Sequence, residues 1–169
     1  TCSANAENCS IARRGRPLSR HQPRQQSGAA LRRPCDYDAF VGLIGQAQQR
    51  HKLSLLAVCM MPNHVHLVVA QQGANDISRW MHWLLTTHGH RHHLGRGTCG
   101  RVWQGRFKAF AIQQDVHLLT VMRYVERNPL RARLVERAED WALGSLAWRR
   151  RGAWEELLAS PPLALPANW

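Results

Sequence analysis

The stretch SLLAVCMMPNHVHLVVA, residues 54–70, decides the fold. Apolar and β-branched residues fill it on both sides of Pro62-Asn63, a dipeptide typical of a turn. The pattern therefore predicts a hairpin of two strands, 54–61 and 64–70. Because side chains alternate along a strand, the second strand is expected to turn three apolar side chains toward a core: Val65, Leu67 and Val69.

Two histidines, His64 and His66, share the opposite face of that second strand. An imidazole beside an apolar layer needs a polar partner, and one metal ion could serve both rings. A structural role for two hydrogen-bonded rings is the alternative, and the spacing by itself leaves both interpretations open.

The composition points to a polyanionic partner. The 169 residues are enough for one domain with a core. Lys and Arg number 23 against 11 Asp and Glu, a formal net charge of +12. Most of these cations are arginines, which suit phosphate, and seven tryptophans offer surfaces for stacking bases. Nucleic acid is the predicted partner, and non-specific adhesion to polyanions is the alternative.

The cysteines and the hydropathy argue against other classes of protein. The five cysteines form no CxxC pair, which argues against a zinc ribbon or a disulfide scaffold and fits a reducing cytoplasm. No apolar run reaches membrane-spanning length, and the N-terminus lacks the apolar segment of a signal peptide. We therefore expect no membrane partner and a cytoplasmic, nucleoid-associated location.

The chain divides into three parts. Residues 1–34 form an atypical basic arm without helical or strand periodicity, which we expect to be disordered. Residues 35–135 form the folded domain, and 136–169 are a C-terminal tail with helical potential. Within the domain, periodicity predicts the hairpin, a strand over 101–113, and helices over 36–53, 77–94 and 115–127. Four histidines at the end of the second helix are expected on a solvated face: His88, His90, His92 and His93.

Tyr124 and Asn128 lie four residues apart in the last predicted helix, so both can share one helix face, close to Arg127 and Arg131. Each has an ordinary alternative. The tyrosine could pack at the edge of the core, and the asparagine could cap a helix that begins at Pro129.

Three segments, MPNHVHLVV, VWQGRFKAF and YVERNPLRARLV, occur in this order and resemble the single-tyrosine HUH transposases. The resemblance is greatest to the branch of REP-associated tyrosine transposases, and it covers about 35–135. It implies an α+β fold, a ferredoxin-like antiparallel sheet with helices packed on one face. It also implies a DNA transposase that is a single-strand endonuclease and strand transferase. Such an enzyme cleaves and rejoins DNA at hairpin-flanked sites through a 5′-phosphotyrosine intermediate.

By this resemblance, Tyr124 is the nucleophile, and His64, His66 and Asn128 hold a divalent cation, Mg²⁺ or Mn²⁺. The implied partner is single-stranded or hairpin DNA, bound by a monomer or a homodimer. The alternative is a non-catalytic, nucleic-acid-binding remnant of such a transposase. The candidates for DNA contact lie in the third predicted strand and the tyrosine helix: Arg101, Trp103, Gln104, Arg106, Lys108, Arg123, Arg127 and Arg131. Trp103 is equally a candidate for the core.

One departure from the family concerns the first strand. The family's sheet begins with a central strand before the first helix, and residues 1–34 contain no recognisable strand, so we expect it to be missing or replaced. A one-nucleotide shift of frame over Leu18–Arg33 can yield YHVTNRGNNRARLFDD, close to the family segment. A frameshift is therefore our hypothesis, and the nucleotide sequence of the gene tests it. The free energy of the backbone hydrogen bonds and burial lost with a central strand would be comparable to or above the roughly 5–15 kcal/mol stability of a typical domain.

Overall fold

The computed structural model describes residues 2–5, 30–31, 33–71, 76–103, 107–112, 116–167 and 169. Their strands are β1 (Cys2–Asn5), β2 (Leu53–Met60), β3 (Val65–Gln71) and β4 (Lys108–Ala111). Their α-helices are α1 (Pro34–Arg50), α2 (Asp76–Leu94), α3 (Val116–Glu126), α4 (Asn128–Arg131) and α5 (Ser145–Arg151). Two short 3₁₀ helices, η1 (Ala138–Asp140) and η2 (Glu155–Leu157), flank α5. None of these helices is long and apolar enough to cross a membrane.

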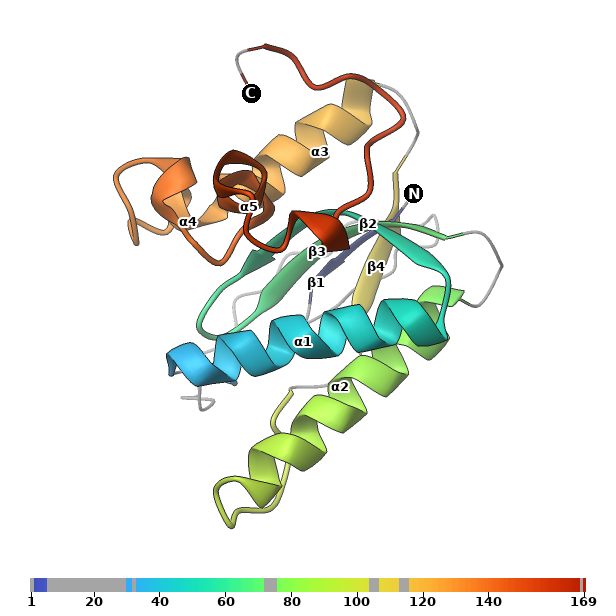
Figure 1. Cartoon of the computed structure of the whole chain (residues 1–169), viewed down its shortest axis with the longest axis vertical. Coiled ribbons are helices and arrows are strands. Elements are labelled where there is room, and N and C mark those ends of the chain that lie inside the picture. The colour runs from blue at the N-terminus through green and yellow to red at the C-terminus, as the bar shows by residue number, and fades with distance from the viewer. Residues whose placement is uncertain are drawn as a thin grey trace, which may run out of the picture.

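The strands form one antiparallel sheet in the order β2-β3-β1-β4 (Figure 1). Together with the chain order β1-α1-β2-β3-α2-β4, this is the arrangement of a ferredoxin-like fold. The predicted α+β class is therefore confirmed, and the hairpin falls within a residue or two of its predicted bounds. Its turn is closed by a hydrogen bond from the Met61 amide to the His64 carbonyl, 2.8 Å long.

The first helical layer covers one face of the sheet. Helices α1 and α2 lie side by side there (Figure 1). The side chains of Phe40, Leu43 and Ile44 are fully buried, as the helical spacing predicts. They meet the predicted core face of β3, Val65, Leu67 and Val69, in one apolar cluster. The core side of the hairpin is thus confirmed.

Helices also pack on the other face, which the sequence analysis did not anticipate. Leu118, Met122 and Val125 of α3 lie against Val68 of β3 and against the β2 residues Leu56, Ala57 and Cys59. The nearly continuous apolar run of β2 places apolar side chains on both faces of the sheet, and a bulge between Leu55 and Ala57 shifts their alternation. The expectation of helices on one face therefore needs correction, since α3 and the C-terminal segment cover the second face.

The expected gap in the sheet is filled. Strand β1, Cys2–Asn5, lies between β3 and β4 and pairs antiparallel with both. The first strand is thus replaced rather than missing, and the expectation that residues 1–34 contain no strand is wrong at these four residues. Ala30 and Leu31 also join the core. The frameshift hypothesis falls mostly on residues outside those described, and the three-part division of the chain stays a prediction.

Two further expectations change. Strand β4 is shorter than the predicted 101–113, because residues 101–103 lie outside the sheet. The histidine tract is not wholly solvated: His88 is 4% exposed, and its ring lies 5.1 Å from those of both Phe40 and Trp103. Burial, with the charge of His92, lowers the pKa of His88 to about 4.

Candidate active site

The hairpin brings the two histidines of the motif together. His66, 5% exposed, lies on the side of β3 that faces α3, and His64 stands just before the strand. Their Nε2 atoms are 2.9 Å apart. The Nδ1 atom of His64 lies 2.9 Å from the Asn63 side-chain oxygen, which only accepts hydrogen bonds. Nδ1 therefore carries the hydrogen, and Nε2 of His64 keeps its lone pair.

Both imidazoles are neutral at neutral pH. Burial, together with the neighbouring His64, lowers the pKa of His66 to about 3. Burial also lowers the pKa of His64. Neutral imidazole is the form that coordinates metal ions, because each ring then has a nitrogen lone pair.

Tyr124 lies beside this pair. One face of α3, with Leu118, Met122 and Val125, packs on the sheet. The adjacent face of the helix carries Tyr124 near the N-terminal end of β3, where His66 lies. Its ring centre is 6.4 Å from that of His66, and its side chain is 46% exposed. The guanidinium of Arg131 lies over the ring, 4.9 Å from its centre.

Asn128 follows on the same side of the helix. Its Nδ2 donates to the carbonyls of Tyr124, at 2.9 Å, and Val125, at 3.3 Å. It is the first residue of α4 and makes no capping hydrogen bond, so the predicted N-cap alternative is wrong. With the nitrogen directed at the helix, the side-chain oxygen is the end left to coordinate an ion.

These residues fit a divalent cation. When two nitrogen ligands lie about 2.1 Å from one ion and the nitrogen–ion–nitrogen angle is about 90°, the two nitrogens are about 3 Å apart. This is close to the separation of the two Nε2 atoms. The described residues contain no group of three or more His, Cys, Asp or Glu side chains that could hold a metal, so a closed zinc site of such ligands is absent there. With the Asn128 amide oxygen as a third ligand, the two imidazoles would form an open, mixed set, which suits Mg²⁺ or Mn²⁺ completed by oxygen ligands.

Comparison with known proteins decides the family. The family model described as "Transposase IS200 like" matches residues 30–128, more than half of the chain. The chain belongs to the IS200-like transposase family. The recognition of single-tyrosine HUH transposases is thereby confirmed. No curated protein sequence matches the chain.

A solved structure shares the fold of this IS200-like transposase. It is described as a REP-associated tyrosine transposase bound to a REP hairpin. The two chains are 19% identical, with a TM-score of 0.60 over 89% of this chain and 96% of the other. At this identity the likeness concerns the fold alone, and it supports the ferredoxin-like architecture.

The structure describes six of the eight candidate DNA contacts of this IS200-like transposase. Arg101, Arg123, Arg127 and Arg131 are exposed, and Lys108 is half-buried. Trp103 instead packs on Phe40, with ring centres 5.6 Å apart, so it belongs to the core alternative. Gln104 and Arg106 lie outside the described residues.

The sequence analysis missed Glu126, two residues after the tyrosine. It is 3% exposed and accepts hydrogen bonds from Ser145 Oγ at 2.6 Å and Trp169 Nε1 at 2.7 Å. It also forms an ion pair with Arg149, whose other nitrogen donates to the Leu56 carbonyl of β2. Glu126 thus ties α3 to α5 and the C-terminus. Its position four residues after Met122 and eight after Leu118 was the available signal, because that spacing lies on the buried stripe.

Proposed function

We propose that this IS200-like transposase is a metal-dependent single-strand DNA endonuclease and strand transferase that uses Tyr124 as its nucleophile. The observation that supports this most directly is the meeting of two neutral imidazoles, His64 and His66, with an exposed tyrosine 6.4 Å from His66. Segments nearly sixty residues apart contribute these groups, which ordinary core packing does not require.

The chemistry proposed for Tyr124 is an in-line displacement at phosphorus. Its phenolic oxygen attacks the scissile phosphate, a bond forms between that oxygen and phosphorus, and the bond to the 3′ oxygen breaks. The phenolic proton is lost to solvent and the departing oxygen takes up a proton, which leaves a free 3′-hydroxyl and a 5′-phosphotyrosine. A 3′-hydroxyl can then attack the phosphotyrosine, so that the strand is rejoined and the tyrosine released without net loss of a phosphodiester.

We assign His64, His66 and Asn128 to a divalent cation, Mg²⁺ or Mn²⁺. When bound, the cation would polarise the scissile phosphate and neutralise its developing charge. The protein's part is to hold two imidazoles in one orientation: the Asn63 oxygen fixes the tautomer of His64, and burial in the sheet fixes the ring of His66.

The proposed substrate is single-stranded DNA beside a hairpin, held by the exposed arginines of α3 and α4. Arg123, Arg127 and Arg131 surround the tyrosine along the helix and suit contacts to phosphate. That the REP-associated protein was solved with a REP hairpin supports a hairpin as the first probe. A monomer or homodimer in the cytoplasm, associated with the nucleoid, remains the prediction.

The test is a denaturing-gel assay for a covalent protein–DNA adduct. Single-stranded hairpin oligonucleotides from the flanks of the gene are incubated with Mn²⁺ or with EDTA. The chain offers a matched control, because its other tyrosine, Tyr37, is buried and donates to the Leu31 carbonyl at 3.2 Å. An adduct that needs Mn²⁺, disappears in Tyr124→Phe and persists in Tyr37→Phe is the expected result.

Other outcomes separate the alternatives. Folded protein that binds the hairpin but forms no adduct with Mn²⁺ would support the non-catalytic remnant. An adduct that persists in Tyr124→Phe would refute the assignment of the nucleophile.

A further inference from the structure

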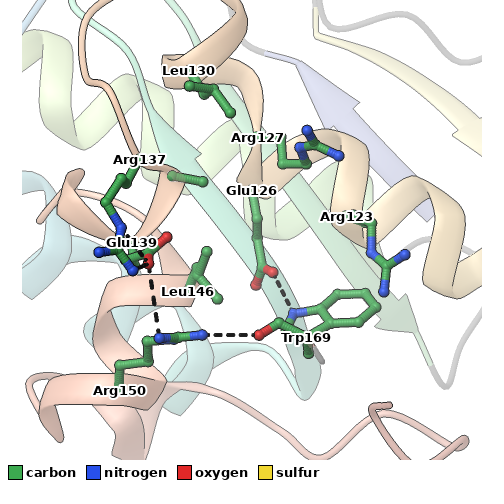
Figure 2. A pocket seen from close by; sticks show the side chains of 10 residues that line it. Arg123, Glu126, Arg127, Leu130, Arg137, Glu139, Leu146, Arg150 and Trp169 are labelled. Atoms are coloured by element: carbon green, nitrogen blue, oxygen red, sulfur yellow. Dashed lines mark hydrogen bonds and ion pairs between the residues drawn. The ribbon is translucent and has the colours of Figure 1, made fainter. Parts of the chain in front are cut away.

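A second candidate site lies beside α3, on the helix face next to the one that carries Tyr124. It is an open cavity of about 380 Å³ lined by residues of α3, α4, η1 and α5 and by the C-terminal Trp169 (Figure 2). Its size falls within the range of about 300–1,000 Å³ typical of pockets for small molecules. Four arginines contribute to its wall: Arg123, Arg127, Arg137 and Arg150. Three apolar side chains line it as well, Leu130, Ala138 and Leu146.

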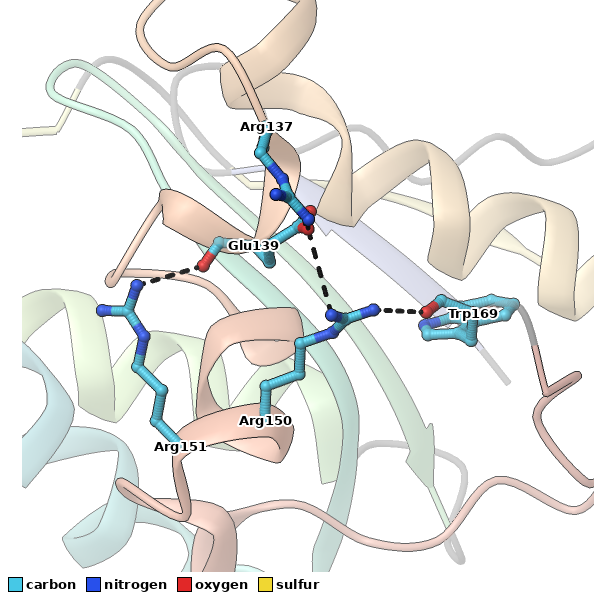
Figure 3. A network of polar contacts seen from close by, with 5 residues as sticks. All are labelled: Arg137, Glu139, Arg150, Arg151 and Trp169. Atoms are coloured by element: carbon cyan, nitrogen blue, oxygen red, sulfur yellow. Dashed lines mark hydrogen bonds and ion pairs between the residues drawn. The ribbon is translucent and has the colours of Figure 1, made fainter.

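The acidic residues of the wall are already paired. Glu126 is held by Ser145, Arg149 and Trp169. Glu139 pairs with Arg137 and, at 3.9 Å, with Arg150, and its backbone carbonyl accepts from Arg151 (Figure 3). The side chains of the wall, four arginines against two glutamates, carry an excess of two positive charges.

Two of these arginines remain available to a ligand. Arg127 makes no ion pair with any residue that the structure describes. Arg123 stacks on the Trp169 ring, 4.9 Å from its centre, which leaves its N–H groups free of a carboxylate among the described residues. Arg150 donates to the Trp169 carbonyl at 3.0 Å and so braces the C-terminus against η1. The cavity wall is therefore basic, because its carboxylates do not neutralise all of its arginines.

The cavity adjoins the candidate active site. Arg123 and Arg127 lie one position before and three positions after Tyr124, and successive helix residues are about 100° apart around the axis. The cavity and the tyrosine thus occupy neighbouring faces of α3. Residues three apart on a helix have Cβ atoms about 5–6 Å apart, so Tyr124 and Arg127 are close enough to contact adjacent nucleotides of one strand.

We propose that this cavity receives one unpaired nucleotide of the single-stranded substrate, next to the phosphate that Tyr124 attacks. The base lies against Leu130, Ala138 and Leu146, and Arg123 and Arg127 hold its phosphate. Apolar contact suits the flat base, and guanidinium groups suit phosphate. The inference rests on the proposed function, because it assumes a single-stranded DNA substrate.

The test compares two octamers of equal charge, (dT)8 and an abasic deoxyribose-phosphate octamer, by fluorescence anisotropy in EDTA. Burial of about 55 Å² of one base against these apolar side chains predicts that the protein binds (dT)8 about tenfold more tightly. Ala138→Phe fills the cavity and should abolish this preference. Ala142→Phe is the matched control, because Ala142 is exposed, lies outside the cavity wall and should leave the preference intact. Thermal melts verify that both variants fold.

A second pair of variants guards against a folding defect in Ala138→Phe. Arg127→Gln removes a cavity arginine that makes no ion pair with any described residue, and it should weaken binding of both octamers at least about threefold relative to Arg79→Gln, a surface arginine on α2 outside the cavity. Equal affinity for the two octamers, no measurable binding of (dT)8, or a preference that survives in folded Ala138→Phe overturns the proposal. Because the assay requires no cleavage, these results are independent of the adduct assay, and failure of the nucleophile assignment is distinguishable from failure of the cavity.

Discussion

Removal of the Glu126 carboxylate should destabilise the fold far more than removal of an exposed carboxylate. In Glu126→Ala the guanidinium of Arg149, with a side chain 17% exposed, keeps only the Leu56 carbonyl as a partner among the described residues. Ser145 and Trp169 lose their acceptor as well. Breaking a buried ion pair by removing one partner costs about 3–5 kcal/mol. That is a large fraction of the roughly 5–15 kcal/mol that stabilises a typical domain.

Urea unfolding at 25 °C measures this cost, with Glu136→Ala as the control for loss of an exposed carboxylate. The double variant Glu126→Leu, Arg149→Met replaces both charges by apolar groups of similar size and should be more stable than Glu126→Ala. A free energy of unfolding for Glu126→Ala within about 1 kcal/mol of the wild type would refute the reasoning. A double variant less stable than Glu126→Ala would refute it equally, because the unpaired charge would then not be the cause.

Three further predictions concern other parts of the chain. The pKa of His88 is about 4 in the folded protein against an ordinary 6.5, so between these pH values the unfolded chain binds a proton that the folded protein does not. The free energy of unfolding should therefore fall by up to about 3 kcal/mol as the pH is lowered from 6.5 to 4. Urea midpoints at pH 4.5 and 7 should therefore differ less in His88→Leu than in the wild type, and an equal difference would contradict the assignment. Ala4→Pro removes an amide from a strand paired on both sides and should cost about 3 kcal/mol or more, so a wild-type thermal melt would exclude β1 from the centre of the sheet. Calorimetry should detect Mn²⁺ binding that His66→Ala abolishes and Tyr124→Phe retains, and binding that persists in His66→Ala would remove this residue from the ion.

The spacing of apolar residues along the chain predicted which faces of β3 and α1 are buried. Alternation along 64–70 located the buried face of β3, and helical spacing located Phe40, Leu43 and Ile44. The family motifs brought His66 and Tyr124 to one place, although neither residue justified a site alone. The roles of these residues remain predictions, because geometry tests whether they meet and not what they catalyse.

The rest depended on tertiary contacts that have no local signal. The four residues of β1 show no apolar alternation, and their place between β3 and β4 is set by backbone pairing. The burial of Trp103 and His88 against Phe40 likewise joins a loop to two helices. Glu126 did lie on the apolar stripe of its helix. Its charge suggested exposure, and only the arrival of Arg149 from α5 makes its burial tolerable.

The same contacts explain how an exposed tyrosine can have a defined position. Tyr124 is 46% exposed and the packed core does not surround it, so its place relative to His66 depends on the helix that carries it. Helix α3 is held on the sheet by Val125 directly after the tyrosine and by Glu126 after that. A reactive group on a rigid element keeps its geometry while remaining accessible to a large substrate. The buried carboxylate of Glu126 would then serve the chemistry through position alone, and weakening its contacts should cost activity before it unfolds the sheet.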